Sequence, residues 1–305
     1  MALKQLKSKI KATIRTNKVT KAMEAVSAVK MRTSQQRAFR ARPYAEAALS
    51  ILARISGSGE AFSHPLATAR AVKNTLTIVV TSDKGLAGSL NSSILKELER
   101  GLRSRGADRD TQSFICIGRK GYEYVLRQDY KVLREYLNMG DDVTIQDMEE
   151  ATSLAIRAFE SGGVDEVYVL YTNFRSTFQQ EPTLRKILPL QKGMLEEMVQ
   201  GIVPEKGRFS EAKDASIVVP SYTIEPDATE VLEVLFPRLV AVSLYHALLE
   251  AKASEHSARM VAMKNASDKS KEMVKDLSRE YNGERQALIT REVSEIVGGI
   301  EAMTH

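Results

Sequence analysis

The stretch LFPRLVAVSLYHALLEAKASEHSARMVAM, residues 235–263, decides the fold of this chain. Apolar or small residues recur in it at alternating steps of four and three: Leu235, Leu239, Val242, His246, Leu249, Ala253, His256, Met260 and Met263. That spacing predicts the narrow apolar seam of a coiled coil, rather than the broad apolar face of a globular helix.

The pattern continues toward the carboxyl end with two irregularities. It lapses at Ser267 and Ser270 and resumes at Val274, Leu277 and Tyr281. A four-four step through Arg285 then shifts its phase, which indicates a stutter. The last run of the seam is Ile289, Val293, Ile296, Ile300 and Met303. At about 1.5 Å per residue, a helix of about 65 residues is a rod of roughly 100 Å.

The first 56 residues offer a partner for this seam. They contain no glycine and are rich in Ala, Lys, Arg, Gln and Met, which favour a helix. Their one proline, Pro43, is expected to bend or interrupt that helix, and Pro237 predicts a kink near residues 233–237. We expect the helices of residues 1–56 and 227–305 to pair antiparallel, because the middle of the chain can then sit compactly at one end of the pair.

The middle of the chain, residues 57–226, has a different composition. It holds fourteen of the seventeen glycines and six of the eight prolines. Thr144, with Asp147 three residues on, predicts a capped helix that ends near Ser161. Strands are expected at 76–83, 112–118, 131–136, 166–174 and, antiparallel, at 183–190. Helices are expected at about 86–104 and 119–128, and residues 191–220 as an irregular loop.

Alternating strands and helices of this kind indicate a parallel sheet. The predicted fold class is therefore α/β. A long antiparallel coiled coil of the N- and C-terminal helices is joined to a central Rossmann-like α/β domain of residues 57–226.

The net charge of +5 is unevenly distributed along the chain. Residues 1–42 hold twelve Lys and Arg against one acid, Glu24. Three interpretations compete: a transit peptide, a surface that tracks a nucleic-acid backbone, and a solvated helix face that meets an acidic protein surface. The helical pattern runs on without a processing site, which weakens the first. The basic residues are not interleaved with aromatic ones, which weakens the second.

The most site-like segment of the α/β domain is TSDKGLAGSLNSS, residues 81–93, where a doubly wound fold usually holds phosphate. Gly85 and Gly88 do not form a GxGxxG fingerprint, and there is no Walker motif. The four histidines, His64, His246, His256 and His305, form no metal or catalytic constellation. We expect a structural turn here, with a nucleotide-dependent enzyme as a remote alternative, and no cofactor or metal. The single cysteine, Cys116, is expected to be buried, and no apolar run near the ~20 residues of a membrane span is found.

Four segments, in order along the chain, resemble the gamma subunits of F-type ATP synthases. They are VTKAMEAVSAVKM (19–31), TSDKGLAGSLNSSI (81–94), SEHSARMVAMKNASD (254–268) and YNGERQALITREVSEIVGG (281–299). The resemblance covers essentially the whole chain. It implies a non-catalytic central rotor stalk that couples proton-driven rotation of a c-subunit ring to ATP synthesis or hydrolysis at the beta subunits.

The resemblance also implies partners and a location. The partners are the alpha and beta subunits of the catalytic hexamer, the epsilon subunit and the c ring, with the α/β domain as a membrane-side foot. The location is the cytoplasmic side of a bacterial cell membrane, bound peripherally. Expected contacts with the hexamer are Met23, Arg259, Arg285, Gln286, Thr290, Glu292 and Glu295. The alternative hypothesis is a coiled-coil adaptor that binds nucleic acid through the basic first helix.

Overall fold

The computed structural model describes residues 2–55, 64–106, 108–190 and 228–304. The predicted loop at 191–220 lies outside the described residues. The chain forms two compact units, which are described separately: residues 1–27 with 260–305, and residues 28–259. Where the three predicted domains meet, at 56/57 and 226/227, stays a prediction.

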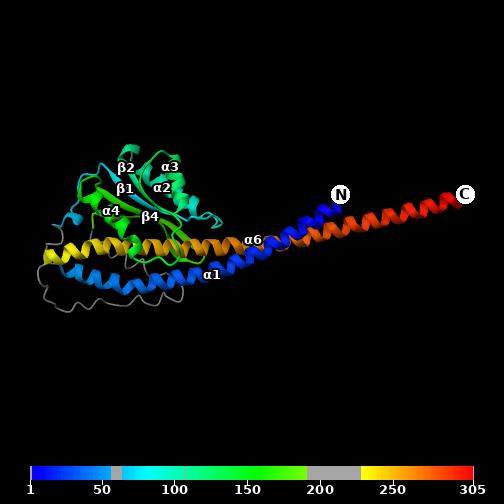
Figure 1. The fold of residues 1–305 in the computed structure, drawn as a ribbon, viewed down its shortest axis with the longest axis horizontal. Coiled ribbons are helices and arrows are strands. Elements are labelled where there is room, and N and C mark those ends of the chain that lie inside the picture. The colour runs from blue at the N-terminus through cyan, green and yellow to red at the C-terminus, as the bar shows by residue number, and fades with distance from the viewer. Residues whose placement is uncertain (1, 56–63, 107, 191–227, 305) are drawn as a thin grey trace. The chain divides into compact units, whose positions relative to one another are not determined.

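Two long helices begin and end the described chain (Figure 1). Helix α1 runs over Ala2–Ile55, and helix α6 over Ala228–Thr304, which is 77 residues. Helix α1 continues through Pro43 and α6 through Pro237, so neither proline interrupts its helix. A proline removes one backbone donor, and the strong helix formers on both sides keep the remaining hydrogen bonds.

In the unit of residues 1–27 and 260–305, the two helices pair antiparallel as predicted. Asn17 donates from Nδ2 to the carbonyl oxygen of Ser267 at 2.6 Å, and one turn earlier Thr13 Oγ1 lies 4.0 Å from Sδ of Met273. Ser267 and Ser270 are 2% and 9% exposed, so the seam does not lapse there. Serine fills these two positions because its small side chain lets the helix backbones approach.

The unit of residues 28–259 is built on a five-stranded sheet of order β3-β2-β1-β4-β5. Strands β1 to β4 are parallel to their neighbours, and β5 pairs antiparallel with β4, as predicted. The strands are β1 Thr75–Val80, β2 Gln112–Ile117, β3 Lys131–Tyr136, β4 Glu166–Ser176 and β5 Gln179–Leu188. The helices between them are α2 Leu90–Ser104, α3 Arg119–Arg127 and α4 Glu149–Glu160. This is the predicted Rossmann-like α/β arrangement.

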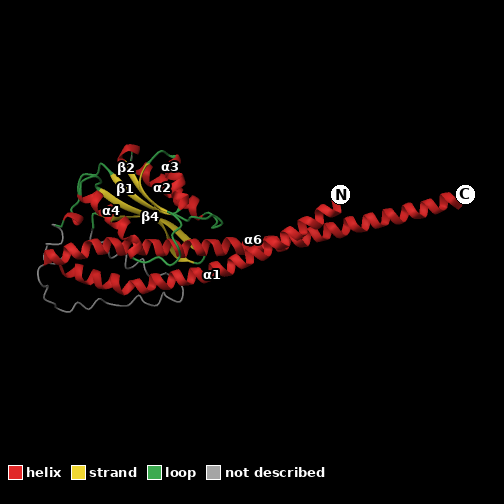
Figure 2. Ribbon diagram, in the orientation of Figure 1, coloured by secondary structure: helices red, strands yellow, loops and turns green. Residues whose placement is uncertain are grey.

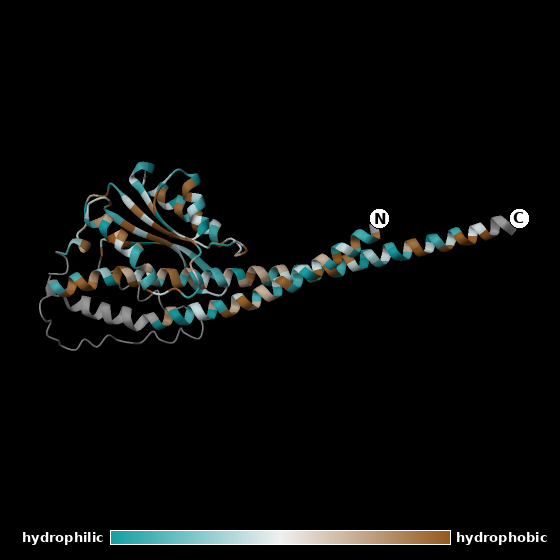
Figure 3. Ribbon diagram, viewed as in Figure 1, coloured by the Kyte–Doolittle hydropathy of each residue, from teal (hydrophilic) through white to brown (hydrophobic). Residues whose placement is uncertain are grey.

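The two faces of the sheet carry separate apolar cores. Figure 2 shows the strands and the helices around them, and Figure 3 shows the hydrophobic residues within these strands. On one face, side chains of β1 and β4 pack against α4 and against the first part of α6, from Leu232 to Ala251. On the other face, Val79 and Leu170 pack against α2 and α3. The first part of helix α6 is therefore a layer of this unit.

Two helix starts differ in detail from the sequence expectation. Helix α2 begins at Leu90 rather than near Leu86, because Leu86 and Gly88 have φ angles of 63° and 58°, which no right-handed helix contains. The predicted pair of α4 forms a contact, in which Asp147 accepts from the backbone nitrogen of Thr144 at 2.7 Å and from its hydroxyl at 2.8 Å. It does not cap α4, because α4 begins at Glu149 with Met148 at its N-cap and no side-chain cap. A short 3₁₀ turn, Gln146–Met148, precedes the α-helical part.

One helix is long and apolar enough to cross a membrane by length and composition, within Glu230–Ile300 of α6. The sequence expectation found no such run. The hydropathy of this helix is highest in one 18-residue window, and 56% of that window is buried inside the protein, as in the core helix of a globular unit. This finding is therefore weak evidence for a membrane span.

Candidate functional site

A ligand of a doubly wound fold usually binds where the chain crosses over at the carboxyl ends of the strands. Here that crevice lies after β1 and β4, and α6 closes it with Leu248, Ala251, Lys252 and Glu255. The remaining cavity is about 10 Å³, which is about the room that one water molecule needs. A nucleotide does not fit into such a space.

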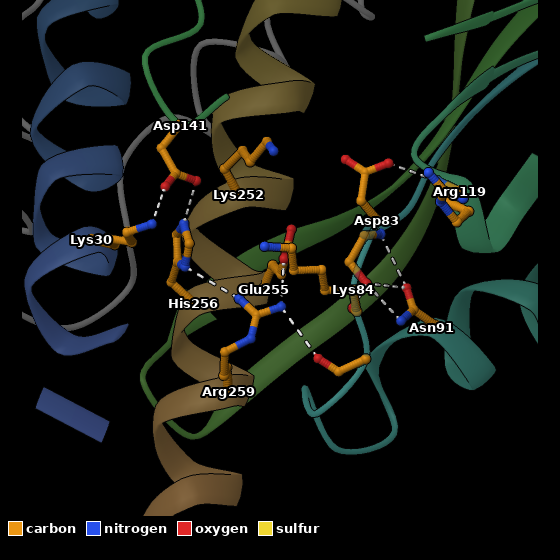
Figure 4. A network of polar contacts seen from close by, with 12 residues as sticks. Lys30, Asp83, Lys84, Asn91, Arg119, Asp141, Lys252, Glu255, His256 and Arg259 are labelled. Atoms are coloured by element: carbon orange, nitrogen blue, oxygen red, sulfur yellow. Dashed lines mark hydrogen bonds and ion pairs between the residues drawn. The ribbon is translucent and has the colours of Figure 1, made fainter. Parts of the chain in front are cut away.

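The polar groups of the TSDKGL turn are used within the protein itself (Figure 4). Ser82 donates to the carbonyl oxygen of Lys84 at 2.6 Å, and its backbone nitrogen donates to Oδ1 of Asn91 at 3.1 Å. Asp83 accepts from the backbone nitrogen of Arg119 at 3.0 Å. Gly118 lies so near that a Cβ there would stand 2.0 Å from the carbonyl oxygen of Thr81. The turn is therefore a brace between the ends of β1 and β2.

No metal site is found among the described residues, since no three His, Cys, Asp or Glu side chains gather there. Cys116 is buried in the sheet, and burial raises the pKa of its thiol to about 12, so it is not a nucleophile at neutral pH. His64 caps a 3₁₀ turn by accepting from the backbone nitrogen of Leu66. The described α/β unit thus has no catalytic constellation.

A chain of polar contacts links four elements of this unit (Figure 4). Lys30 of α1 forms an ion pair of 2.6 Å with Asp141, which follows β3. Asp141 also lies 2.8 Å from Nε2 of His256 on α6. His256 contacts Arg259 one turn on, at 3.4 Å from its Nδ1, and Arg259 donates to the carbonyl oxygen of Gly85 at 3.4 Å. We call this set the polar chain: Lys30, Asp141, His256, Arg259 and Gly85.

The protonation states of Asp141 and His256 fit the contacts of the polar chain. Partial burial alone would raise the pKa of Asp141, but hydrogen bonds from Lys30 and His256 outweigh it and hold that pKa at about 2. Burial lowers the pKa of His256, and the neighbouring Asp141 opposes this only in part. The imidazole is therefore neutral at pH 7. From its partners we assign the proton to Nε2, which donates to Asp141, while Nδ1 accepts from Arg259.

Arg259, the predicted supporting position, therefore serves inside the unit. Its guanidinium forms an ion pair of 2.6 Å with Glu255, and the two side chains are 11% and 12% exposed. The sequence prediction located this arginine but missed its partners. Glu255 and His256 are one turn away on the same helix, whereas Gly85 is far from Arg259 in sequence, so no local spacing could have found that contact.

The other predicted contacts lie in the unit of residues 1–27 and 260–305. Met23 of α1 is half-buried. The remaining five lie on the exposed end of α6: Arg285, Gln286, Thr290, Glu292 and Glu295. At about 100° per residue they flank an apolar stripe, with Gln286 and Thr290 on one side and Glu292 and Glu295 on the other.

That stripe is the largest exposed apolar feature of α6. Its four central residues lie within an arc of about 60°. They are Ile289, Val293, Ile296 and Ile300, which are 46%, 53%, 62% and 57% exposed. Among the described residues of this unit α1 does not reach them, because it pairs near Met273 and Ser267. An exposed stripe of this kind is typical of a surface that binds another protein.

The chain is similar to known proteins in sequence and in fold. A family model described as ATP synthase matches residues 2–303. The ATP synthase gamma chain of Macrococcus caseolyticus is 37% identical over 99% of both chains.

Among solved structures, one that is 26% identical, with a TM-score of 0.57, is a chain of the central stalk and c ring of Tetrahymena thermophila mitochondrial ATP synthase. The match covers 82% of this chain and 99% of that one. A chain of Euglena gracilis mitochondrial ATP synthase, 17% identical with a TM-score of 0.65 and covering 99% and 94%, shares the fold.

The fold and the exposed end of α6 define an α/β protein with long terminal helices and an apolar surface suited to another protein. The comparisons carry this further: the chain belongs to the ATP synthase gamma-chain family and is a non-catalytic stalk subunit. The nucleic-acid adaptor and the nucleotide-dependent enzyme are not supported.

Proposed function

We propose that this chain is the central rotor of a proton-driven ATP synthase, coupling rotation of a c-subunit ring to ATP synthesis or hydrolysis at the beta subunits. One observation carries the mechanical part of the proposal. The end of α6 exposes an apolar stripe from Ile289 to Ile300. A hexamer of alpha and beta subunits would cover this stripe, and a smooth apolar surface can turn there without fixed polar contacts.

The proposed contacts with the hexamer are Met23, Arg259 and the residues that flank the stripe: Arg285, Gln286, Thr290, Glu292 and Glu295. Arg259 differs from the others because its side chain is held by Glu255. We assign it the role of supporting the TSDKGL turn, which would then meet the hexamer. The basic residues of α1 would face acidic parts of the beta subunits, where electrostatic contact exerts force without permanent docking.

The α/β unit is proposed as the foot that meets the c ring and the epsilon subunit. The closed crevice supports this structural role, because the unit has the Rossmann-like fold of many nucleotide-binding domains but no room for a nucleotide in its crevice. The whole chain would be bound peripherally at the cytoplasmic side of a bacterial cell membrane.

The proposal is tested by deleting Arg285 to His305 in a complex assembled with alpha and beta subunits and the c ring. Proton pumping per ATP hydrolysed should fall sharply, because the stripe and its flanking residues are removed. The thermal unfolding of the α/β unit should be unchanged, since these residues contribute nothing to its core. Unfolding of that unit, or undiminished pumping, would contradict the assignment.

A further inference from the structure

The two long helices are attached to the α/β unit in different ways. Helix α6 inserts apolar side chains into the core, including Phe236, Leu239 and Leu248, each at most 2% exposed. Helix α1, over its described side chains from Ala28 to Arg40, buries only Met31 and Ser34. Apolar packing therefore holds α6 firmly to the sheet, whereas over Ala28–Arg40 it holds α1 only weakly.

Polar contacts take over this task for α1, and they converge on one loop. Residues Met139–Val143 follow β3, and we call them the clasp loop. From α1, Lys30 pairs with the Asp141 carboxylate, and Arg37 binds both the Asp141 carbonyl and the Asp142 carboxylate.

The clasp loop is also held from the other side by α6. Lys252 donates to the carbonyl oxygen of Met139 at 2.9 Å, and Tyr245 donates to that of Val143 at 3.3 Å. His256 completes the grip on Asp141 at 2.8 Å. The loop therefore lies between charged or polar side chains of both helices.

Within the clasp loop, Asp141 is the side chain that both helices share. Met31 is the one apolar side chain that α1 buries over Ala28–Arg40, so apolar contacts there define the register of α1 poorly. A polar group with fixed partners defines it well, because any other register leaves a charge without its partner. The His256 side chain is 5% exposed and that of Asp141 is 32% exposed, so this contact is partly shielded from solvent and from screening by salt.

We propose that Asp141 is a positioning residue for rotation: it fixes the register of α1 against α6 and passes torque from the α/β unit to α1. This rests on the proposed function as a rotor. The polar chain extends the connection, because His256 also contacts Arg259, which holds the TSDKGL turn at Gly85. Movement of α1 is thereby linked to the turn through four contacts.

The first experiment measures the register directly in the assembled complex. Spin labels at Val29→Cys on α1 and Leu126→Cys on α3, both exposed positions, report one distance within this unit. The chain's own Cys116 is buried and does not take a label. We expect a narrow distance distribution in the parent, and a broadened or shifted one in Asp141→Asn and in His256→Leu.

Two further variants separate positioning from packing. His256→Gln keeps one donor for Asp141 and one acceptor for Arg259, and should restore the parent distribution. Lys30→Gln removes only the contact on α1, and because Lys30 is half exposed it does not threaten folding. It should broaden the distribution as Asp141→Asn does. A matched control is Glu97→Gln, which breaks an ion pair within α2 at 2.7 Å from Arg100 and should change nothing.

The second experiment measures coupling in the same complexes. Protons pumped per ATP hydrolysed should fall at least about twofold in Asp141→Asn and Lys30→Gln, and recover in His256→Gln relative to His256→Leu. An unchanged distance distribution, or unchanged pumping in both Asp141→Asn and Lys30→Gln, overturns the proposal. A parent complex that assembles but does not pump would instead contradict the rotor function, so the two failures are distinguishable.

Discussion

The two ends of helix α6 follow one kind of apolar periodicity and bury it in opposite ways. From Leu232 to Ala251 most apolar side chains are core residues, with Leu239 and Val240 fully buried and Val234 the exception at 60% exposed. From Leu288 to Ile300 they are exposed, with Ile296 at 62%. An apolar periodicity therefore indicates that a helix face packs against protein. Only the structure shows whether that protein is the same chain.

The comparison predicts its largest effect for truncations at equivalent aliphatic residues. Leu239→Ala should lower the free energy of unfolding of the isolated chain by about 2–5 kcal/mol, because it leaves a cavity between α6 and the sheet. Ile296→Ala should change it by less than about 0.5 kcal/mol, because its side chain contacts solvent. Urea unfolding followed by circular dichroism measures both. Equal losses would show that the exposed end is also a stabilising part of the isolated chain.

A second prediction concerns a buried pair in the core half of α6. Nε2 of His246 lies 3.7 Å from Oε1 of Glu250, and both side chains are buried. Burial raises the pKa of Glu250 to about 8, with Arg185 opposing, and burial lowers that of His246 to about 3. Both side chains are therefore uncharged at pH 7, so the core holds no charge from this pair.

The pH dependence of stability follows from these two directions. The unfolded Glu250 loses its proton above about pH 4.5 but the folded one keeps it to about 8, so this group makes stability fall with rising pH over that range. His246 makes stability rise with pH from about 3 to about 6.5, so the two effects cancel between about pH 4.5 and 6.5.

From pH 6.5 to 8 the net loss should be at most about 1.4 kcal/mol per pH unit. Glu250→Gln should remove this slope, as measured by urea unfolding across pH 6 to 9. A slope that survives the substitution would assign it to another group. The two ends of α6 would then differ in packing as described, but the buried His246–Glu250 pair would not explain a pH dependence of stability.

A smaller effect is expected where the seam passes from apolar to polar residues. Asn17 donates to the carbonyl oxygen of Ser267 at 2.6 Å and to its hydroxyl at 3.1 Å. Asn17→Ala should cost about 1 kcal/mol, because partly buried acceptors lose their donor. Asn265→Ala, on an exposed position of the same stretch, is the control and should be neutral. If both substitutions cost the same, helix propensity rather than the seam contact would explain the loss.

The smallest effect is predicted at the exposed end. Arg291 and Glu295 form an ion pair of 3.2 Å, and their side chains are 81% and 68% exposed. Arg291→Ala should change stability by no more than about 0.5 kcal/mol, and less at high salt. Thermal unfolding in low and high salt checks this. A salt-dependent loss well above that size would mean that this end is folded against something within the chain.

Sequence patterns predicted the helices and strands well, because the spacing of apolar residues within each element reflects which of its faces is buried. The run LTIVV at residues 76–80 alternates between two apolar cores and was recognisable as a buried parallel strand. The seam at Leu235 to Met263 predicted a long helix, but the prediction of a narrow coiled-coil face was wrong there, because α6 is broadly buried against the sheet up to Ala251. Leu86 was misplaced in a helix because a left-handed residue leaves no mark in an apolar pattern.

The polar chain could not be predicted, for a different physical reason. Asp141 and His256 are 115 positions apart, and their contact exists only after the sheet and α6 have packed. Ser267 was taken for a lapse because serine is polar, although its size suits a close helix contact. His256 was expected only to pack. A polar residue on a seam beside small neighbours was the one signal that pointed to it.

The central claim is that this chain turns within its complex, and rotation can be observed directly. A probe attached at Leu126→Cys, on an exposed position of α3, would be followed in single complexes of this chain with alpha and beta subunits held on a surface. The account predicts rotation in one direction that starts when ATP is added and stops when it is exhausted. A probe that stays fixed while the complex hydrolyses ATP would contradict it.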